Sequence, residues 1–393
     1  MIFHVIGIGN KQPVFSKEQK KLIDNNTVFS GGKRHLELVK DVLPENYQWI
    51  YIKSPMTAVF KQYEEAKETI IVFASGNPLF YGFANTLQNK YPQSSVYTEP
   101  YFSSIQLLAN KTSTNSNELV TISVHGRSWD ALDVALIEQQ SLIGVLTDGH
   151  KNPKTIVERL LQYGFTNYEI SIGEDLEGEN EKVQTLSLSE AVTKNYHKLN
   201  CILLHRKEKR KQYFGIEDSN FEGLPGRPNM ITKMPIRLTT LHLLEVLNAS
   251  VFWDIGFCTG SISIEAKLKN PNLEIVAFEK REECEEILFT NQKRFGVPGI
   301  NGVIGDFFEQ DTRTFRQPDT VFIGGHGGRL EELLIKVDEV LSSNAIIVMN
   351  TVKETSKNTF KKSCENLGWK VKEEINLTLD LHNPICLLKA IKT

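Results

Sequence analysis

The first half of the chain alternates short apolar runs with amphipathic, partly charged stretches. The runs are rich in Ile, Leu and Val, are long enough for buried strands, and lie at residues 2–8, 69–74, 119–124, 142–147 and 200–205. Residues 16–25 have helical spacing and open with Ser16 and Gln19, the pattern of a helix capping box. This alternation predicts an α/β fold with a largely parallel sheet.

The second half restarts the alternation after a change in character. Residues 206–211 are a charge run and residues 215–230 are rich in Gly and Pro, so we expect a linker over 206–229 between domains at 1–205 and 230–393. Helices are predicted at 235–248, 261–269 and 281–295, and strands at 251–255, 273–278, 302–304, 320–323 and 345–349. Residues 369–392 are typical of two longer strands around a turn at Asn383 and Pro384.

A glycine turn joins the strand at 251–255 to the helix that follows it. Gly256 and Gly260 let a ligand approach the backbone where a β-carbon would intrude. The next strand ends at Glu279, whose carboxylate is placed to accept hydrogen bonds from both ribose hydroxyls of an adenosine group. The turn and the acid together favour a nucleoside site over a purely structural turn.

The spacing of this turn favours S-adenosylmethionine (SAM) over a dinucleotide. Dinucleotide sites use G-x-G-x-x-G to cradle a pyrophosphate, whereas this turn is D-x-G-x-x-x-G, with Cys258 where a middle glycine would sit. SAM has no phosphate, and Asp254 is placed to reach its charged amino group or to brace the loop. A third contact, Gly305-Asp306-Phe307, suits the adenine edge. The arrangement resembles the Rossmann-like SAM-dependent methyltransferases.

Composition argues against several other classes of protein. With 45 Lys+Arg against 48 Asp+Glu, the chain lacks the electrostatic footprint of a general nucleic-acid binder. The fourth strand of the second half ends in VFIGGHGG, not in the Asn/Asp-Pro-Pro-aromatic motif of methyltransferases that act on nucleic-acid bases. No run approaches the length of a membrane span. Five scattered cysteines without a C-x-x-C pair indicate reduced thiols in a cytoplasmic protein with no bound metal.

Longer motifs in both halves resemble one family. The first half contributes VIGIG (5–9), GGKRHL (31–36), SGNPLFYG (75–82), SVHGR (123–127) and LTD (146–148). The second contributes residues 230–237, WDIGFCTGSISIEA (253–266), RFGV (294–297), FIGGHGG (322–328) and NTV (350–352). In order and over nearly the whole chain, they resemble the bifunctional precorrin-6Y C5,15-methyltransferase (decarboxylating) family of cobalamin biosynthesis. Asn10-Lys11, Asn77 and Cys258 depart from the family pattern, which has Pro-Gly, Asp and a small glycine there.

The resemblance implies two folds and two SAM sites. An N-terminal tetrapyrrole methylase fold of two α/β subdomains would bind SAM through Gly7, Gly9, Gly76, Asn77 and Pro78 and methylate ring carbon 5 of precorrin-6B. A C-terminal Rossmann-like fold would methylate carbon 15 and decarboxylate the ring C acetate. Its SAM contacts would be Thr232, Asp254, Gly256, Phe257, Cys258, Thr259, Gly260, Glu279, Gly305, Asp306 and Phe307. The resemblance also implies a homo-oligomer.

A precorrin-type tetrapyrrole carries many carboxylates, which need cationic partners. The candidates are Arg34, Arg127, Lys233, Arg237 and Arg329, each equally compatible with a surface charge or an internal ion pair. His326 is compatible with a substrate contact or with a loop histidine bound to backbone. Methyl transfer to an electron-rich ring carbon needs no nucleophilic triad, and we assign no catalytic residue.

Three alternatives to this bifunctional enzyme stay open. They are a SAM methyltransferase for another small molecule, a nicotinamide-dependent oxidoreductase, and a non-catalytic sensor of a nucleoside or tetrapyrrole. The sequence does not distinguish a cobalt-bearing from a metal-free substrate.

Overall fold

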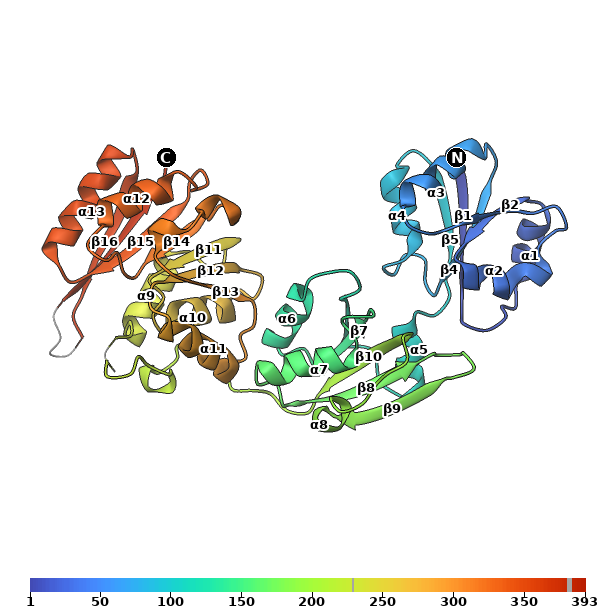
Figure 1. The fold of residues 1–393 in the computed structure, drawn as a ribbon, viewed down its shortest axis with the longest axis horizontal. Helices are drawn as coiled ribbons and strands as arrows, with labels where there is room; N and C mark the ends of the chain where they lie inside the picture. Colours follow the sequence, from blue (N-terminus) through green and yellow to red (C-terminus); the bar gives the residue numbers. More distant parts are fainter. Residues whose placement is uncertain (228–229, 380–383) are drawn as a thin grey trace. The chain divides into compact units, whose positions relative to one another are not determined.

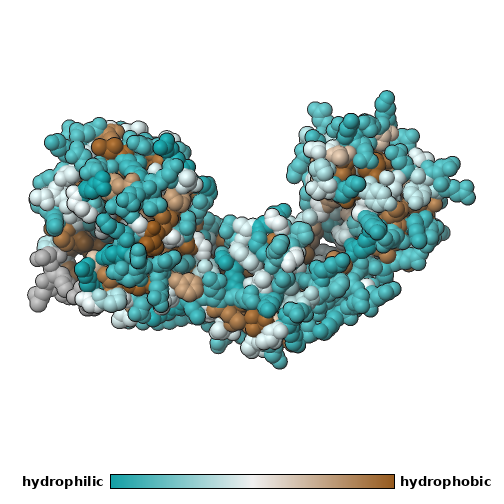
Figure 2. All heavy atoms as spheres, in the orientation of Figure 1, coloured by the Kyte–Doolittle hydropathy of each residue, from teal (hydrophilic) through white to brown (hydrophobic). Residues whose placement is uncertain are grey.

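The computed structural model describes residues 1–227, 230–379 and 384–393, which divide into two compact units (Figure 1). The first unit comprises Met1–Ser128, Gln140–Glu158 and Asn167–Glu208, and the second comprises Trp129–Gln139, Arg159–Thr166 and Lys209–Thr393. Both units expose a mostly hydrophilic surface with scattered apolar side chains (Figure 2). Among the described residues, no helix has the length and apolar character needed to cross a membrane.

The first sheet is wholly parallel, with the strand order β3-β2-β4-β1-β5. Its strands are β1 (Ile2–Ile8), β2 (Val28–Gly31), β3 (Gln48–Tyr51), β4 (Ile70–Ser75) and β5 (Ser95–Glu99). One face packs on α1 (Lys17–Asp24) and α2 (Lys33–Val39), and the other on α3 (Met56–Glu65) and α4 (Phe83–Lys90). The predicted capping box is confirmed, because Ser16 and Gln19 exchange side-chain-to-backbone hydrogen bonds before α1.

The second sheet, also in the first unit, is mixed, so the prediction of a largely parallel sheet is wrong here. Its order is β6-β7-β10-β8-β9, and only β6 and β7 are parallel. The strands are β6 (Leu119–Ser123), β7 (Leu142–Leu146), β8 (Tyr168–Glu174), β9 (Lys182–Ser187) and β10 (Asn200–Arg206). A short loop with no crossover helix joins β8 to β9, which forces them antiparallel. Helices α5 (Ser104–Lys111) and α8 (Leu188–Ala191) contact this sheet. Helix α6 (Asp130–Ile137) belongs to the second unit, and α7 (Pro153–Gln162) begins in the first unit and ends in the second.

The third sheet forms the centre of the second unit, with the order β13-β12-β11-β14-β15-β17-β16. The strands are β11 (Val251–Ile255), β12 (Glu274–Glu279), β13 (Ile300–Ile304), β14 (Thr320–Ile323), β15 (Ile346–Thr351), β16 (Lys370–Leu377) and β17 (Ile385–Ile391). The first five are parallel, and β17 and β16 add an antiparallel edge. From β11 the chain order of the strands runs one way to β12 and β13 and the other way to β14 and β15, so the loops after β11 and β14 diverge. The crevice between such loops is the usual ligand site of an open α/β sheet.

Helices cover both faces of the third sheet because successive side chains of each strand point to opposite sides. They are α9 (Met234–Leu243), α10 (Ser261–Lys269), α11 (Glu283–Phe295), α12 (Leu330–Asp338) and α13 (Glu354–Asn366). Trp253 and Ile255 pack in the cluster that contains α12 and α13, whereas Phe252 packs with α9 and α10. Apart from the first helix, the helices predicted in this half and the strands predicted between 251 and 349 are confirmed within two residues at their ends.

Two predicted segments differ from the structure. Helix α9 ends at Leu243, not at residue 248, because Glu245 adopts a positive φ of 51° that stops the helix. Most of the predicted linker, 206–229, belongs to the second unit, where Ile216, Phe221 and Leu224 are buried in a cluster with residues of α10 and α11. A turn was predicted at Asn383 and Pro384, and Asn383 lies outside the described residues.

Candidate functional site

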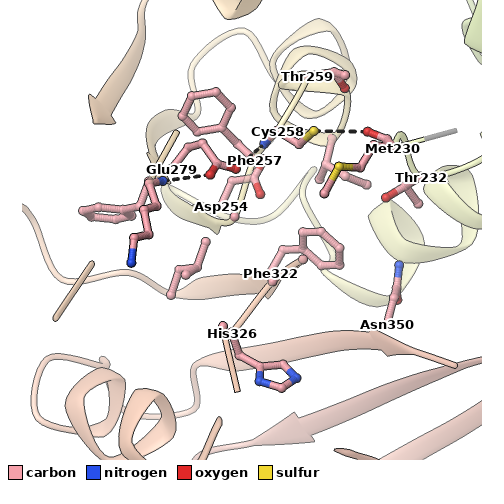
Figure 3. Close-up of a pocket in the computed structure, with 18 of the residues that line it drawn as sticks. Met230, Thr232, Asp254, Phe257, Cys258, Thr259, Glu279, Phe322, His326 and Asn350 are labelled. Carbon is pink, nitrogen blue, oxygen red and sulfur yellow. Dashed lines mark hydrogen bonds between the residues drawn. The ribbon is translucent and has the colours of Figure 1, made fainter. Parts of the chain in front are cut away.

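A cavity of about 840 Å³ opens at the carboxyl edge of the third sheet (Figure 3). Most of the residues predicted for the second SAM site line it, although they come from four separate segments of the chain. The predicted residues in its wall are Thr232, Lys233, Asp254, Gly256, Phe257, Cys258, Thr259, Glu279, Gly305, Asp306, Phe307, His326 and Arg329. Gly260 and Arg237 lie outside the wall.

The glycine turn leaves β11 and passes close to the loop after β14. Gly256 has a φ of +84°, and a β-carbon there would lie 2.7 Å from the backbone nitrogen of Gly325. Gly260 is the N-cap of α10, and a β-carbon on it would lie 2.3 Å from Leu288 of α11. Only glycine fits at these two positions, so the turn has the close backbone packing that the sequence predicts.

Asp254 ends β11 beneath this turn and is 1% exposed. Its Oδ2 atom accepts a 2.6 Å hydrogen bond from Ser263 of α10, while its Oδ1 atom has no partner. Burial, together with the charge of Glu279, raises the pKa of Asp254 to about 7. Nearby, the buried Thr259 hydroxyl also lacks a partner. Asp254 therefore braces the loop and leaves one carboxylate oxygen for a cationic ligand.

Glu279 lies at the end of β12, where the sequence places the ribose acceptor. Its Oε2 accepts hydrogen bonds from the Cys258 amide at 3.1 Å and from Arg281 Nη2 at 2.8 Å, and its Oε1 accepts one from Arg281 Nε at 3.0 Å. Burial by itself raises the pKa of Glu279, but the hydrogen bonds and charge of Arg281 outweigh it and lower the pKa below its usual value. Glu279 is therefore ionised at neutral pH, and Arg281 must share it with any ribose.

Asp306 and Phe307 follow β13 at the third side of the cavity. The Oδ1 atom of Asp306 accepts the Phe308 amide at 3.0 Å, which lowers the pKa of Asp306, and its Oδ2 lies 3.4 Å from Lys280 Nζ. Phe307 is 7% exposed and packs edge-on against Phe278. This corner combines a polar edge with an apolar floor, which suits a purine base.

The wall of the cavity opposite the acidic residues is mainly apolar, with the polar residue Asn350 among its side chains. The apolar side chains come from α9, β14, β16, β17 and the loops after β15 and β16, and they are Ile236, Phe322, Val352, Leu377, Leu379 and Ile385. Asn350 of β15 also lines this wall and donates a 2.8 Å hydrogen bond to Thr240. The glycine-rich loop after β14 completes the wall without bulky side chains. Such a surface suits the face of a broad, flat ligand.

His326 stands in that loop with both ring nitrogens near polar groups. Its Nδ1 accepts the Gly328 amide at 3.2 Å, and its Nε2 lies 3.5 Å from the Ser356 hydroxyl. Burial, and then the charge of Lys353, lower the pKa of His326. The side chain is therefore neutral at pH 7, with its proton on Nε2, because Nδ1 is an acceptor.

Of the three cations predicted beside this site, two line the cavity. Lys233 lies 3.7 Å from Asp218, and Arg329 stacks 3.6 Å from the Phe308 ring while pairing with Glu332 at 2.6 Å. Both remain partly exposed and are placed to meet a carboxylate at the rim.

Arg237 requires a correction. Its side chain is fully buried, and its guanidinium pairs with Glu265 at 2.5 Å and with Asp218 at 2.7 Å and donates to the Ile216 and Thr232 carbonyls. These bonds use four of its five N–H donors and the side chain is not exposed to the cavity, so Arg237 holds the segment before α9 against α10. The sequence could not show this, because Glu265 is a helical position 28 residues away.

In the first unit, Gly7, Gly9 and Gly76 meet at the carboxyl edge of the first sheet. A β-carbon on Gly7 would lie 2.1 Å from the Gly76 carbonyl oxygen, and one on Gly9 would lie 2.4 Å from Glu177 Oε2. Gly76 itself has a φ of +65°. The adjacent strands β1 and β4 bring these glycines together, and the close backbone packing explains the residue type.

Asn77 and Pro78 form the turn that follows. The Oδ1 atom of Asn77 accepts the Leu79 amide at 2.9 Å, so this side chain stabilises the turn before α4. A β-carbon on Gly82 would lie 2.4 Å from the Pro78 carbonyl oxygen, which shows how tightly the turn is packed.

The two arginines predicted in this unit have different surroundings. Arg34 donates to Asn10 Oδ1 at 2.6 Å and to Ser75 Oγ at 2.7 Å, at the same sheet edge as the glycines. Asn10, one of the departures from the family pattern, also donates to Asp175 at 2.6 Å. Arg127 instead lies 5.2 Å from the Tyr81 ring and lines a separate recess.

These features fit SAM in the second unit. The turn is a cradle that β-carbons would fill, Asp254 Oδ1 and Thr259 Oγ1 are buried polar atoms without partners, and Glu279 is an ionised acceptor. SAM carries a sulfonium and an ammonium group, so this acidic end of the cavity matches its charge. Arg281 was not predicted as a site residue, because it belongs to no motif, and Asn350 was predicted only as part of the NTV motif, with no role in the cavity.

Comparisons with known proteins agree with this geometry. A precorrin methyltransferase domain model matches residues 227–379. A precorrin-6Y C(5,15)-methyltransferase [decarboxylating] of Sinorhizobium sp is 30% identical over 352 residues, which is 88% of this chain and 84% of that protein.

Two shorter relatives match parts of the chain. A cobalt-precorrin-7 C(5)-methyltransferase of Salmonella typhimurium is 26% identical over 51% of this chain and 96% of its own length. A probable cobalt-precorrin-6B C(15)-methyltransferase (decarboxylating) of Thermoplasma volcanium is 33% identical over 40% of this chain and 78% of its own length.

Proposed function

Because the chain belongs to the precorrin-6Y C(5,15)-methyltransferase (decarboxylating) family, we propose that it methylates a precorrin at ring carbons 5 and 15 and removes carbon dioxide from the ring C acetate. The observation that carries the proposal is the cavity of the second unit. It places acids at the ends of β11 and β12 and after β13, beside a broad apolar wall. Such a site accommodates a cationic nucleoside next to a flat macrocycle.

We assign the carbon 15 and decarboxylation chemistry to the second unit and the carbon 5 methylation to the first. Two relatives with single printed activities, one at C(5) and one at C(15), match 51% and 40% of this chain. The precorrin methyltransferase domain match at residues 227–379 lies wholly in the second unit. The glycine edge of the first sheet supports a second SAM site in the first unit.

When bound, SAM would supply an activated methyl group, which an electron-rich ring carbon attacks while S-adenosylhomocysteine leaves. Asp254 would hold the ammonium group of SAM and Glu279 its ribose hydroxyls, and these two contacts would orient the cofactor. The apolar wall with Phe322 and Val352 excludes water and supports the ring face. Alignment of the two reactants accounts for most of the acceleration, because no side chain has to act as nucleophile.

The decarboxylation also needs little from the protein beyond placement. The conjugated ring accepts the electron pair when carbon dioxide leaves. A carboxylate that is less solvated loses carbon dioxide more readily. Lys233 and Arg329 at the rim hold the other carboxylates of the ring. The neutral His326, with its Nε2 proton, is placed in the glycine loop to protonate or hydrogen-bond the ring side chain.

Mass spectrometry of the product tests this proposal. With precorrin substrate and SAM, the full chain is expected to add two methyl groups and release one carbon dioxide. A product with methyl groups but no decarboxylation, or no product, would contradict it. Titration with SAM and with NAD(H) separates the proposal from an oxidoreductase, since only SAM should bind. The same proposal includes a cytoplasmic homo-oligomer, and light scattering tests the assembly.

A further inference from the structure

A chain of polar side chains crosses the carboxyl edge of the first sheet, beside the glycines of the first unit. Ser75 is the last residue of β4 and immediately precedes Gly76. Arg34 and His35 lie in α2, which follows β2, the neighbour of β4 in the sheet. Arg34 Nη2 donates to Ser75 Oγ at 2.7 Å, and His35 Nε2 lies 2.9 Å from the same oxygen. Two nitrogen groups from the helix thus meet one hydroxyl group at the end of the strand.

The second contact of His35 fixes the position of its proton. The backbone amide of Gly32 donates to His35 Nδ1 at 3.1 Å, so Nδ1 carries no proton. Burial, and then the charge of Arg34, lower the pKa of His35 to about 4, and the ring is therefore neutral at pH 7. A neutral imidazole that accepts at Nδ1 has its proton on Nε2, so His35 donates to Ser75.

The hydroxyl group of Ser75 consequently accepts two hydrogen bonds. A hydroxyl oxygen has two lone pairs and one proton, and here Arg34 and His35 occupy both lone pairs. Within the part of the chain that the structure describes, no group accepts the proton of this hydroxyl. Because the Ser75 side chain is exposed, its proton is directed toward the open edge of the sheet. The charge of Arg34 makes the hydroxyl a stronger donor.

Arg34 also has donors left for a ligand. It uses two of its five N–H groups, one for Ser75 and one for Asn10 Oδ1 at 2.6 Å. Among the described residues Arg34 forms no ion pair, and Asn10 stands between it and the carboxylate of Asp175. Asn10 Nδ2 donates to Asp175 Oδ1 at 2.6 Å. The guanidinium is thus held in place, and no carboxylate of the protein neutralises it by direct contact.

Asn10 positions Arg34 through a side chain that proline, the residue of the family pattern at this position, does not have. The two contacts of Asn10 define its orientation, since a carboxylate only accepts hydrogen bonds and a guanidinium only donates them. Asp175 is 8% exposed and anchors Asn10 from behind. The departure at Asn10 therefore has a physical role: it directs a charged group toward the same edge as the Ser75 hydroxyl.

We propose that Ser75 and Arg34 form a two-point site for one carboxylate in the first unit, with Ser75 donating to one carboxylate oxygen and Arg34 to the other. His35 and Asn10 are positioning residues for this site. Two donors with one positive charge between them match the two acceptor oxygens and the negative charge of a carboxylate. The inference rests on the proposed function, whose reactants offer two sources of the group: a side chain of the precorrin, or the amino-acid end of SAM.

The rate of carbon 5 methylation tests the first source. The full chain is supplied with a precorrin and with SAM that carries carbon-13 in its methyl group, and NMR resolves the two new methyl groups. If the carboxylate belongs to the precorrin, Ser75→Ala is expected to raise the KM for precorrin at carbon 5 by about tenfold with little change in kcat, because a charged hydrogen bond is lost. The affinity of the first unit for S-adenosylhomocysteine should then stay unchanged.

Calorimetry tests the second source. S-adenosylhomocysteine has the amino-acid carboxylate and methylthioadenosine lacks it, and the binding event of the first unit is identified as the one that Gly7→Ala removes. If the carboxylate belongs to the cofactor, Ser75→Ala is expected to lower the affinity for S-adenosylhomocysteine by about tenfold and to leave that for methylthioadenosine unchanged. An equal loss for both ligands would overturn the proposal, because the hydroxyl would then act on the nucleoside or on the fold.

Asn10→Ala tests the positioning role. It is expected to change the same parameter as Ser75→Ala by about threefold, because Arg34 loses one neutral hydrogen bond. In Arg34→Ala, the further loss of Asn10 should have no effect, since Asn10 acts only through Arg34, and additive effects would refute its role. By the same reasoning His35→Phe should add nothing to Ser75→Ala.

Ser95→Ala is the matched control for Ser75→Ala. Ser95 is exposed and begins β5, so it lies at the opposite edge of the same parallel sheet and should change neither the KM nor either affinity. If carbon 5 methylation proceeds and Ser75→Ala also leaves all three values unchanged, the carboxylate site is refuted. A chain that neither methylates carbon 5 nor binds S-adenosylhomocysteine in the first unit would contradict the proposed function, and the carboxylate site would fall with it.

Discussion

The ionisation of Asp254 gives the sharpest test of the site. Its carboxyl is 1% exposed, and burial raises its pKa to about 7, with the charge of Glu279 adding to the effect. In the unfolded chain the pKa of an Asp is about 4. The folded state therefore binds this proton more tightly than the unfolded state does.

The sign of the pH effect follows from this difference. Below pH 4 the carboxyl is protonated in both states and has no effect on the free energy of unfolding. As the pH rises, the unfolded state ionises first, so the fold loses stability until Asp254 also ionises near pH 7. A difference of about three pKa units corresponds to about 4 kcal/mol of lost stability above pH 7.

Asp254→Asn removes this penalty and retains the acceptor for Ser263. We expect the variant to be more stable than the unaltered chain by about 1–2 kcal/mol at pH 5 and by about 4 kcal/mol at pH 8. Urea denaturation at both pH values measures this stability. The unfolding transition of the second unit is identified as the one that S-adenosylhomocysteine shifts. Asp311→Asn, at a side chain that is 64% exposed, is the control and should show no such growth with pH. A stabilisation by Asp254→Asn that is the same at both pH values would refute the reasoning.

The same Asp254→Asn substitution should weaken the binding of SAM, although it stabilises the fold. Loss of a charged hydrogen bond to the ammonium of SAM costs about 1.5–3 kcal/mol, or roughly ten- to a hundredfold in affinity. The affinity of the unaltered site should rise with pH through about 7, the pKa of Asp254, whereas that of Asp254→Asn should stay flat. Equal pH profiles would show that Asp254 does not contact the cofactor.

Three further substitutions test other parts of the structure. Gly256→Ala should abolish binding of S-adenosylhomocysteine in the second unit, because its β-carbon meets backbone at 2.7 Å, whereas Gly327→Ala, with open space around it, should cost only about 1 kcal/mol of stability in urea denaturation. Gly7→Ala should remove only the binding event of the first unit, because its β-carbon would lie 2.1 Å from a carbonyl oxygen, and calorimetry should still detect the other event. Arg237→Met should destabilise the second unit by about 3–5 kcal/mol in urea denaturation, because it strands a buried carboxylate, and an unchanged midpoint would contradict the assigned ion pair.

Much of the second unit followed from the sequence, because its signals are local. The strand at 251–255 and the helix at 261–269 have the predicted bounds, since an apolar run, a glycine turn and a helical pattern follow one another directly. The first sheet is parallel as predicted. The second sheet is not parallel. Strand β9 is partly exposed and has many polar residues, and the short loop between β8 and β9 makes them antiparallel neighbours.

The sequence by itself determined the residue types of the site: the glycines of the turn and the acids at the strand ends. These are fixed locally, since a turn that a β-carbon would block requires glycine wherever it lies in the fold. Only the tertiary structure decided which charges remain available to a ligand. Arg237 is paired with Glu265, 28 residues away in the chain, because packing brings α9 against α10, and Arg281 folds back onto Glu279. Pairing between distant side chains depends on the sheet order, and no local pattern specifies that order.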